Sequence, residues 1–294
     1  MKVIGIDAGG THIKAGFLHG AEILESERFP TGREVSAYHA QEQVLHAVET
    51  MHKNFPSAEA IGLVVPGVVD TENQIARYSE NIGWKDVHFG KMIHDLTGLP
   101  VGFGHDVRAG GLAEFTFGAS KNHANSLFIA IGTGIAGAMI IDGQLLDDPY
   151  AGELGHLNIG SAFGCPCGAH GCLETIATGP SIARIYNERS GESVAGSLEV
   201  VKAAQGGNRI AQEVWDEAAR ALGAALMSYI NILAPELIVL GGGVSQAGRT
   251  LIDPINSYLD THITFQRKPE IRIAALGDSA GMIGAGIYAS KAHV

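Results

Sequence analysis

The sequence has 294 residues, of which 46% are hydrophobic and 17% charged, a composition typical of folded globular chains rather than disordered ones. Its net charge of −11 comes from 20 basic and 31 acidic residues and argues against a nucleic-acid-binding surface, which needs clustered Lys and Arg. No apolar run approaches the roughly 18 residues of a membrane span, and the start of the chain shows no signal peptide. We therefore expect a cytoplasmic protein with no nucleic-acid or membrane partner.

The chain opens with an apolar strand at 3–6 that ends at Asp7, followed by a tight turn, Gly9-Gly10-Thr11, and a second strand at 13–18. A hairpin loop of this kind leaves backbone N–H groups and a hydroxyl free to face a phosphate. A plain hairpin turn fits the pattern equally well. Asp7, at a strand end beside this loop, is suited to hold Mg²⁺, mostly through water.

Asp106 follows a predicted strand at 101–103 and precedes a predicted helix at 109–117. Because ligands in α/β folds bind outside the carboxyl ends of strands, this carboxylate is placed to face a ligand. The alternative is an N-cap, since Asp commonly caps the helix that follows it. The residues alone leave both interpretations open.

The pattern of the first hairpin recurs further along the chain. An apolar strand at 127–131 leads into the turn Gly132-Thr133-Gly134 and a strand at 138–141. The two glycine turns occupy equivalent places in the two halves, which indicates an internal duplication. We therefore expect two related α/β lobes, each built on a hairpin.

The remaining elements follow from apolar patterning. The triplet Gly241-Gly242-Gly243 follows a parallel-type strand and would let a base or ribose approach the backbone. The other elements expected are a strand around 23–29, a helix at 34–53, a strand at 60–65, a loop at 81–84, a helix at 89–97, helices at 180–189, 198–205 and 210–233, a strand at 237–240 and a helix at 281–289.

All three cysteines lie in one short stretch, Cys165, Cys167 and Cys172, with His156 nine positions ahead of the first. Three thiolates and one imidazole form a closed tetrahedral zinc set, which is structural rather than catalytic. Three buried free thiols are the alternative, because free Cys packs as a small hydrophobe. His170, inside the loop, competes as the fourth ligand, and we favour His156.

Two motifs, Glu-Leu-Gly-His at 153–156 and Cys-x-Cys-Gly-x-x-Gly-Cys-Leu-Glu at 165–174, resemble the ROK family of bacterial sugar kinases and sugar-responsive repressors. The resemblance extends over nearly the whole chain. It implies an actin/hexokinase-like (ribonuclease H-like) duplicated two-lobe fold with a cleft between the lobes. We expect a small lobe at 1–118, with the helix at 281–294 crossing back to it, and a large lobe at 119–280.

The resemblance also implies an ATP-dependent glucokinase-like enzyme, active as a homodimer or homotetramer, with Asp106 as the general base. His105 departs from the Asn usual before this Asp, and Arg108 from an Asn frequent two residues after it. The expected sugar-binding residues are Gly67, Asn81, His105, Asp106, Glu153, His156 and Glu174. The expected nucleotide- and Mg²⁺-binding residues are Asp7, Gly9, Gly10, Thr11, Gly132, Thr133, Gly134, Gly241, Gly242 and Gly243.

Several alternatives stay open within this interpretation. Kinases of N-acetylmannosamine, N-acetylglucosamine and fructose share the scaffold with glucokinases, and polyphosphate could replace ATP as the donor. A sugar-responsive repressor would carry a helix-turn-helix ahead of the first glycine loop, and we expect none because that loop starts at Asp7. A non-catalytic sugar-sensing protein would not need Asp7, Asp106 and both phosphate loops together.

Overall fold

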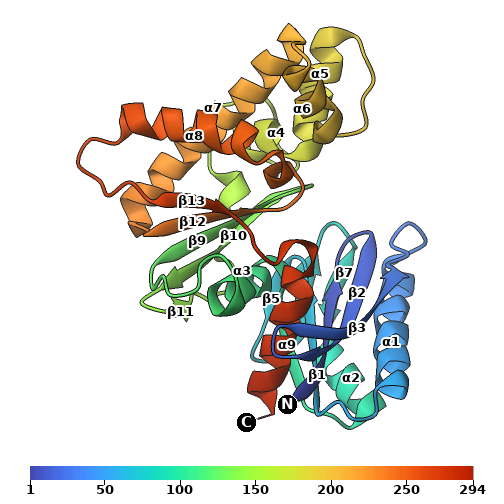
Figure 1. The fold of residues 1–294 in the computed structure, drawn as a ribbon. Helices are drawn as coiled ribbons and strands as arrows, with labels where there is room; N and C mark the ends of the chain where they lie inside the picture. The colour runs from blue at the N-terminus through green and yellow to red at the C-terminus, as the bar shows by residue number, and fades with distance from the viewer. Residues whose placement is uncertain (294) are drawn as a thin grey trace. The chain divides into compact units, whose positions relative to one another are not determined.

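The structure is a computed structural model that describes residues 1–293, and it divides into two compact units (Figure 1). Unit 1 contains residues 1–118, 145–151 and the segment from Asp278 onward, and unit 2 contains residues 119–144 and 152–277. Residues 145–151 and 278–280, which we expected in the large lobe, are therefore part of unit 1. None of the helices in the described part of the chain has the length and apolar character to span a membrane.

Unit 1 is built on a five-stranded sheet of order β3-β2-β1-β4-β8. Strand β1 pairs antiparallel with β2 and parallel with β4, and β4 pairs parallel with β8. The strands are β1 (Lys2–Ala8), β2 (His12–His19), β3 (Glu22–Pro30), β4 (Ala60–Val65) and β8 (Val101–His105). A second sheet, which the sequence did not predict, contains β5 (Val68–Asp70), β6 (Ile75–Ser79) and β7 (Trp84–Val87). Residues 81–83 of the expected loop are thus in the turn between β6 and β7, whereas Trp84 begins β7 and is buried in the core.

Helices cover both faces of the unit 1 sheet (Figure 1). Alternation along the strands separates the faces, because Ile4 and Ile6 pack with α1 residues such as Val44 while Val3 packs with α9. Ser36 caps α1 by accepting a hydrogen bond from the backbone N–H of His39, so the helix starts later than predicted. The helices are α1 (Ala37–Asn54), α2 (Phe89–Thr97), α3 (Asp106–Phe117) and α9 (Ala280–Ala292).

Helix α9 packs on β1, β4 and β8 at van der Waals distance because glycines line the contact. A Cβ added to Gly62 would lie 1.8 Å from the carbonyl oxygen of Ala285, and one added to Gly284 would lie 2.2 Å from that of Ala109. The backbones can approach this closely only where no side chain intervenes. The glycines therefore set the position of α9 over the sheet and beside α3.

Unit 2 repeats the sheet of unit 1. Its strand order is β11-β10-β9-β12-β13, with β9 antiparallel to β10 and parallel to β12, and β12 parallel to β13. The strands are β9 (Ser126–Ile131), β10 (Ile135–Ile141), β11 (Gln144–Leu145), β12 (Leu237–Gly241) and β13 (Glu270–Ile273). The division between the units falls within β11, because Leu145 is counted with unit 1. The strand order is the same in both sheets, and β10, β9, β12 and β13 have the same relative directions as β2, β1, β4 and β8, which confirms the predicted duplication.

Helices α4 to α8 form one core with this sheet. Residues Val214, Ala218 and Leu222 of α7 are buried, so the apolar stripe of this helix is core, as predicted. Helix α8 was not predicted, because Pro254 in its interior breaks the pattern expected of a helix. The helices are α4 (Glu174–Ala177), α5 (Gly179–Ser190), α6 (Ser197–Gln205), α7 (Arg209–Leu233) and α8 (Arg249–His262).

The glycine contact between the sheet and α9 predicts an asymmetric response to alanine. Gly62→Ala should lower the free energy of unfolding by about 2–3 kcal/mol, because the new methyl group meets the rigid backbone of α9. Gly206→Ala is the control, since its Cβ would meet atoms no closer than 3.4 Å and surface changes of this kind stay within about 0.5 kcal/mol. Urea denaturation measures both, and equal stabilities would contradict the packing described.

Candidate active site and metal centre

Two carboxylates lie at the carboxyl edge of the unit 1 sheet. Asp7 is the penultimate residue of β1, and Asp106 follows the last residue of β8. Strand β4 lies between them, with Val64 paired to Asp7 and Val65 paired to His105. Because parallel strands bring their carboxyl ends to one edge, residues 99 positions apart in sequence share one side of the unit.

Asp7 is an unusual carboxylate. Its side chain is only 14% exposed, and burial, followed by the negative charge of Asp106, raises its pKa to about 7. Lys14 acts in the opposite direction, with its Nζ 3.9 Å from Asp7 Oδ2. At neutral pH this group is therefore close to half protonated, and a cation placed beside it would favour the charged form. This chemistry fits the Mg²⁺ role predicted for Asp7.

Asp106 begins α3 and is not its N-cap. The cap is His105, whose Nδ1 accepts hydrogen bonds from the backbone N–H groups of Val107 (3.2 Å) and Arg108 (3.4 Å). Oδ1 of Asp106 accepts a further bond from the Val107 N–H at 2.7 Å and lies 3.3 Å from His105 Nδ1. The alternative that Asp106 is the N-cap of this helix is therefore wrong, because the imidazole of His105 caps it. One carboxylate oxygen of Asp106 is oriented by the helix start.

The first glycine loop is braced by residues that the sequence analysis missed. Gly9 donates its N–H to the carbonyl of His12, and the hydroxyl of Thr31 donates to the carbonyl of Gly9 at 2.7 Å. The guanidinium of Arg33 lies over Gly10 and donates from Nη1 to the carbonyl of Asn81 at 3.1 Å. Arg33 thus links the loop predicted to bind phosphate to the turn predicted to bind sugar.

Gly67 and Asn81 lie near each other through the small sheet of unit 1. Gly67 has φ +102°, and a Cβ there would lie 2.2 Å from the carbonyl oxygen of Tyr78, so only glycine fits this turn after β4. Asn81 is exposed in the turn that follows β6. Both residues therefore lie in turns of unit 1, the unit that also contains Asp106.

In unit 2 the second glycine loop is tied to the end of the cysteine-rich loop. Gly132 donates to the carbonyl of Gly134 (2.9 Å) and accepts from the N–H of Gly179 (3.0 Å), while Thr133 is exposed. Glu174 Oε1 accepts from the N–H of Ile135 at 2.6 Å. One oxygen of the predicted sugar ligand Glu174 is thus already used by the backbone beside the loop.

The glycine triplet after β12 meets the same loop. Gly242 has φ +80° and a Cβ there would lie 2.4 Å from the carbonyl oxygen of Ile131, so the turn ends of β9 and β12 are in contact. A cavity of about 150 Å³ opens beside Gly243. Its lining combines apolar and polar residues: Leu198, Val201, Trp215, Val244 and Ala247 with Ser197, Lys202, Gln205 and Gln246.

The four residues predicted to bind zinc are grouped as predicted. The ligand atoms of His156, Cys165, Cys167 and Cys172 all lie within 4.8 Å of one another. The sulfurs of Cys167 and Cys172 are 3.8 Å apart, and His156 Nδ1 is 3.7 Å from the sulfur of Cys165. Bonds of about 2.3 Å to sulfur and about 2.0 Å to nitrogen give tetrahedral edges of about 3.8 Å and 3.5 Å, so the spacing fits zinc.

The local backbone explains this grouping. Gly168 donates its N–H to the carbonyl of Cys165 (3.0 Å), and its φ of +91° closes a tight turn between two ligands. Leu173 donates to the carbonyl of Leu157, which places Cys172 opposite the segment of His156. His170 pairs instead with Gly164 and lies outside the ligand group.

Glu153 and His156 lie on one side of this group. His156 Nδ1 faces Cys165, whereas its Nε2 faces Glu153 Oε2 at 3.9 Å. A metal on Nδ1 would therefore leave Nε2 and the exposed carboxylate of Glu153 for a second ligand. The turn that carries both is held by Tyr229, whose hydroxyl donates to the carbonyl of Leu154 at 2.5 Å.

Two of the three thiols need a metal to ionise at neutral pH. Burial raises the pKa of Cys165, and it raises that of Cys172 to about 12, whereas a hydrogen bond from the Ala169 N–H lowers the pKa of Cys167. Two of the three groups are therefore protonated at neutral pH without a cation. Zinc binding would release these protons, so zinc affinity should rise with pH.

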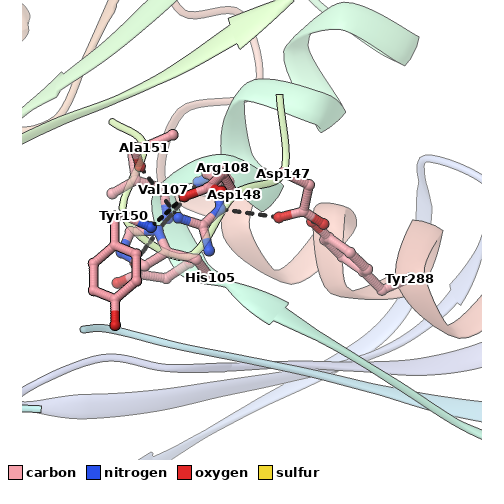
Figure 2. A network of polar contacts seen from close by, with 9 residues as sticks. His105, Val107, Arg108, Asp147, Asp148, Tyr150, Ala151 and Tyr288 are labelled. Atoms are coloured by element: carbon pink, nitrogen blue, oxygen red, sulfur yellow. Dashed lines mark hydrogen bonds and ion pairs between the residues drawn. The ribbon is translucent and has the colours of Figure 1, made fainter. Parts of the chain in front are cut away.

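Arg108 forms a separate network within unit 1 (Figure 2). Its Nε donates to Asp147 Oδ1 at 3.0 Å and its Nη1 to the carbonyl of Ala151 at 3.2 Å, while the hydroxyl of Tyr288 donates to Asp147 Oδ2 at 3.0 Å. The sequence analysis named Arg108 only as a departure from the family pattern. Its partner is 39 positions away and carries no local signal.

We compared the chain with family models, with related proteins and with solved structures. The model of the ROK family matches residues 3–292. The chain belongs to the ROK family. A glucokinase of Halalkalibacterium halodurans is 34% identical over 96% of this chain and 93% of its own length. A ROK hexokinase structure from Thermus thermophilus is 33% identical with a TM-score of 0.83, covering 99% of this chain and 98% of its own.

A second ROK structure carries ligands. The ROK glucokinase of Streptomyces griseus, solved in complex with glucose and AMPPNP, is 28% identical with a TM-score of 0.86, covering 99% of this chain and all of its own. These matches confirm the predicted two-lobe α/β fold.

The raised pKa of Asp7 predicts a metal-free chain that is less stable at high pH. A folded-state pKa above the ordinary value means that the folded state holds its proton more tightly, so stability falls as pH rises from about 4 to about 7. Asp7→Asn should remove this loss and stabilise the metal-free protein by roughly 4 kcal/mol at pH 8 but not at pH 4. Thermal unfolding in chelator measures the difference, with the exposed Asp216→Asn as control. A stability difference between Asp7→Asn and wild type that does not depend on pH would contradict the assignment.

The zinc group predicts one Zn²⁺ per chain and a particular fourth ligand. Elemental analysis should find about one equivalent in the wild type, less than half in Cys167→Ser and His156→Ala, and a wild-type content in His170→Ala. His170→Ala is the matched control because it removes the other imidazole of the same region. Loss of zinc in His170→Ala with retention in His156→Ala would reverse the ligand assignment.

Proposed function

We propose that the chain is an ATP-dependent sugar kinase that transfers the γ-phosphoryl group to the 6-hydroxyl of a hexose, with glucose as the preferred acceptor. The relatedness to ROK glucokinases and hexokinases supports phosphoryl transfer to a sugar. The observation that carries the proposal within this chain is Asp106, oriented by the start of α3 at the same sheet edge as Asp7.

Asp106 acts as the base in this proposal. Its carboxylate accepts the proton of the 6-hydroxyl as the sugar oxygen bonds to the γ-phosphorus, and the bond between that phosphorus and the β,γ-bridging oxygen breaks to leave ADP. The backbone bond from Val107 holds one oxygen of Asp106, so the other can face the acceptor. General-base assistance of this kind contributes about 10²–10⁴-fold.

The nucleotide is held by glycine loops in both units. Gly10 and Thr11 in unit 1 and Thr133 and Gly134 in unit 2 would present backbone N–H groups to the phosphates. The N–H groups of Gly9 and Gly132 instead close their own turns, which shapes the two loops. Asp7 would hold Mg²⁺, which when bound neutralises charge on the β- and γ-phosphates. The cavity beside Gly243 suits the nucleotide base, because its apolar side chains would pack on a flat aromatic ring while its polar ones would bond the ring edge.

The sugar is held by polar side chains around the zinc loop and in unit 1. We assign this role to Gly67, Asn81, His105, Glu153, His156 and Glu174. Zinc at Cys165, Cys167, Cys172 and His156 Nδ1 would be structural, because four protein ligands leave no open position. It would fix the tautomer of His156 and so direct Nε2 toward a sugar hydroxyl.

The identity of the acceptor rests on these hydrogen bonds and is open to direct test. A panel of glucose, mannose, fructose, N-acetylglucosamine and N-acetylmannosamine, with ATP or polyphosphate and Mg²⁺, should give the highest kcat/KM with glucose and ATP. A preference for another sugar would leave the kinase in place and change its substrate. Sugar binding without ADP release from any acceptor would favour the sugar-sensing alternative.

Replacing the base gives the sharpest single-residue test. Asp106→Asn should lower kcat by at least about 10² while sugar affinity stays within a few-fold, because the amide keeps the shape but accepts no proton. Asp95→Asn, an exposed carboxylate on α2 of the same unit, is the control and should leave kcat unchanged. A near-wild-type kcat in Asp106→Asn would remove Asp106 as the base.

A further inference from the structure

Arg108 is a buried cation outside the proposed reaction chemistry. It lies in the first turn of α3, two residues after Asp106, and is 1% exposed. Its Nη2 is buried and has no hydrogen-bond partner among the described residues. Burying a guanidinium costs free energy, because the charge loses its hydration. The hydrogen bonds that Arg108 does make must offset this cost. Those bonds lead to one segment of the chain, residues 147–151 (Figure 2).

Asp147 is the centre of this network. One of its oxygens accepts from Arg108 Nε on α3, and the other accepts from the hydroxyl of Tyr288 on α9. Burial and the negative charge of Asp147 raise the pKa of Tyr288, which keeps the phenol protonated as a donor. The carboxylate of Asp147 therefore links α3 and α9, the two helices that meet at Gly284, and both of its oxygens accept a hydrogen bond.

The segment held in this way has a particular place in the chain. Residues 145–151 belong to unit 1, whereas the residues before and after them, 119–144 and 152–277, belong to unit 2. Arg108 Nη1 donates to the carbonyl of Ala151, the last residue of the segment. Two residues further is Glu153, a proposed sugar ligand. One side chain thus connects the helix that begins with Asp106 to the chain that leads directly into Glu153.

We infer that Arg108 is a positioning residue for phosphoryl transfer, which acts by anchoring residues 147–151 to α3. The inference rests on the proposed function, because it assigns the anchored segment a role through Asp106 and Glu153. Arg suits this task and Lys does not: the planar guanidinium donates to a carboxylate and a carbonyl in different directions at once, whereas an ammonium is a single point of charge. Loosening the anchor broadens the range of positions from which the sugar is presented.

The first test is kinetic. Arg108→Met should lower kcat/KM for the sugar by about 10²-fold, because a displacement of about 1 Å far from the chemistry has effects of this size. Nucleotide affinity measured by calorimetry should stay within about threefold, since Arg108 contacts no nucleotide-binding loop. Arg108→Lys should recover only part of the loss. The control is Arg189→Met, which removes an exposed ion pair with Glu217 and should leave kcat/KM unchanged.

The second test separates positioning from general stability. Tyr288→Phe removes only the hydroxyl bond to Asp147 and should lower sugar kcat/KM by about tenfold. If both residues act through Asp147, the double variant Arg108→Met/Tyr288→Phe should be about as slow as Arg108→Met alone. Independent effects would multiply instead. Tyr288→Phe also keeps the inference testable if Arg108→Met fails to fold.

The outcomes are distinct from those of the proposed function. An inactive wild type would overturn the kinase proposal itself. An active wild type with unchanged sugar kcat/KM in both Tyr288→Phe and Arg108→Lys would overturn the inference alone. Sugar and nucleotide affinities that weaken equally in these variants would also overturn it, because the network would then support the whole fold.

Discussion

The burial of the Asp7 carboxylate beside the charge of Asp106 is the constraint on which this structure's chemistry depends. The parallel pairing of β1, β4 and β8 brings Asp7 and Asp106 to one edge, and burial with the charge of Asp106 raises the pKa of Asp7 to about 7. Such a pair is unfavourable in an isolated fold, and it becomes favourable when a cation joins it. The two carboxylates therefore suit different proposed roles. Asp7, which is more buried, suits the binding of a metal ion, and Asp106, which is oriented by the start of α3, suits the acceptance of a proton.

Helix α9 ties this edge to the rest of unit 1. Gly281 in its first turn lies against the carboxylate of Asp7, so a side chain there would collide with the group. Further along the same helix Gly284 allows contact with α3, and Tyr288 reaches Asp147. The C-terminal helix therefore positions both the carboxylate edge and the segment that leads to Glu153.

The sequence predicted best what is local or repeated. The two glycine hairpins were recognisable because each follows an apolar strand, and the zinc group because four ligands lie within 17 consecutive residues, His156 to Cys172. The strands β5 to β7 were not predicted, because they are short and only partly buried. The bonds of Glu174 to Ile135 and of Arg108 to Asp147 join residues 39 positions apart in both cases. Contacts of this kind depend on tertiary packing, and no spacing rule reports them.

The capping of α3 shows the same limit at one residue. An Asp before a helix is a good cap, yet the adjacent imidazole of His105 takes that role and the helix starts at Asp106 itself. Only the backbone geometry decides between two neighbouring side chains that can both accept. Asp106 accepts from the N–H of Val107 with Oδ1, an arrangement that leaves Oδ2 for the acceptor in the proposed function.

The fold buries the carboxylate of Asp7 beside Asp106, and we expect a bound cation to stabilise its charged form. Carboxyl ¹³C NMR of the protein, titrated with and without Mg²⁺ and a nonhydrolysable ATP analogue, measures this directly. The account predicts a pKa of Asp7 near 7 in the metal-free protein and a fall of at least about two pH units when Mg²⁺ and nucleotide are bound. An ordinary carboxyl pKa in the metal-free protein that Mg²⁺ and nucleotide leave unchanged would contradict it.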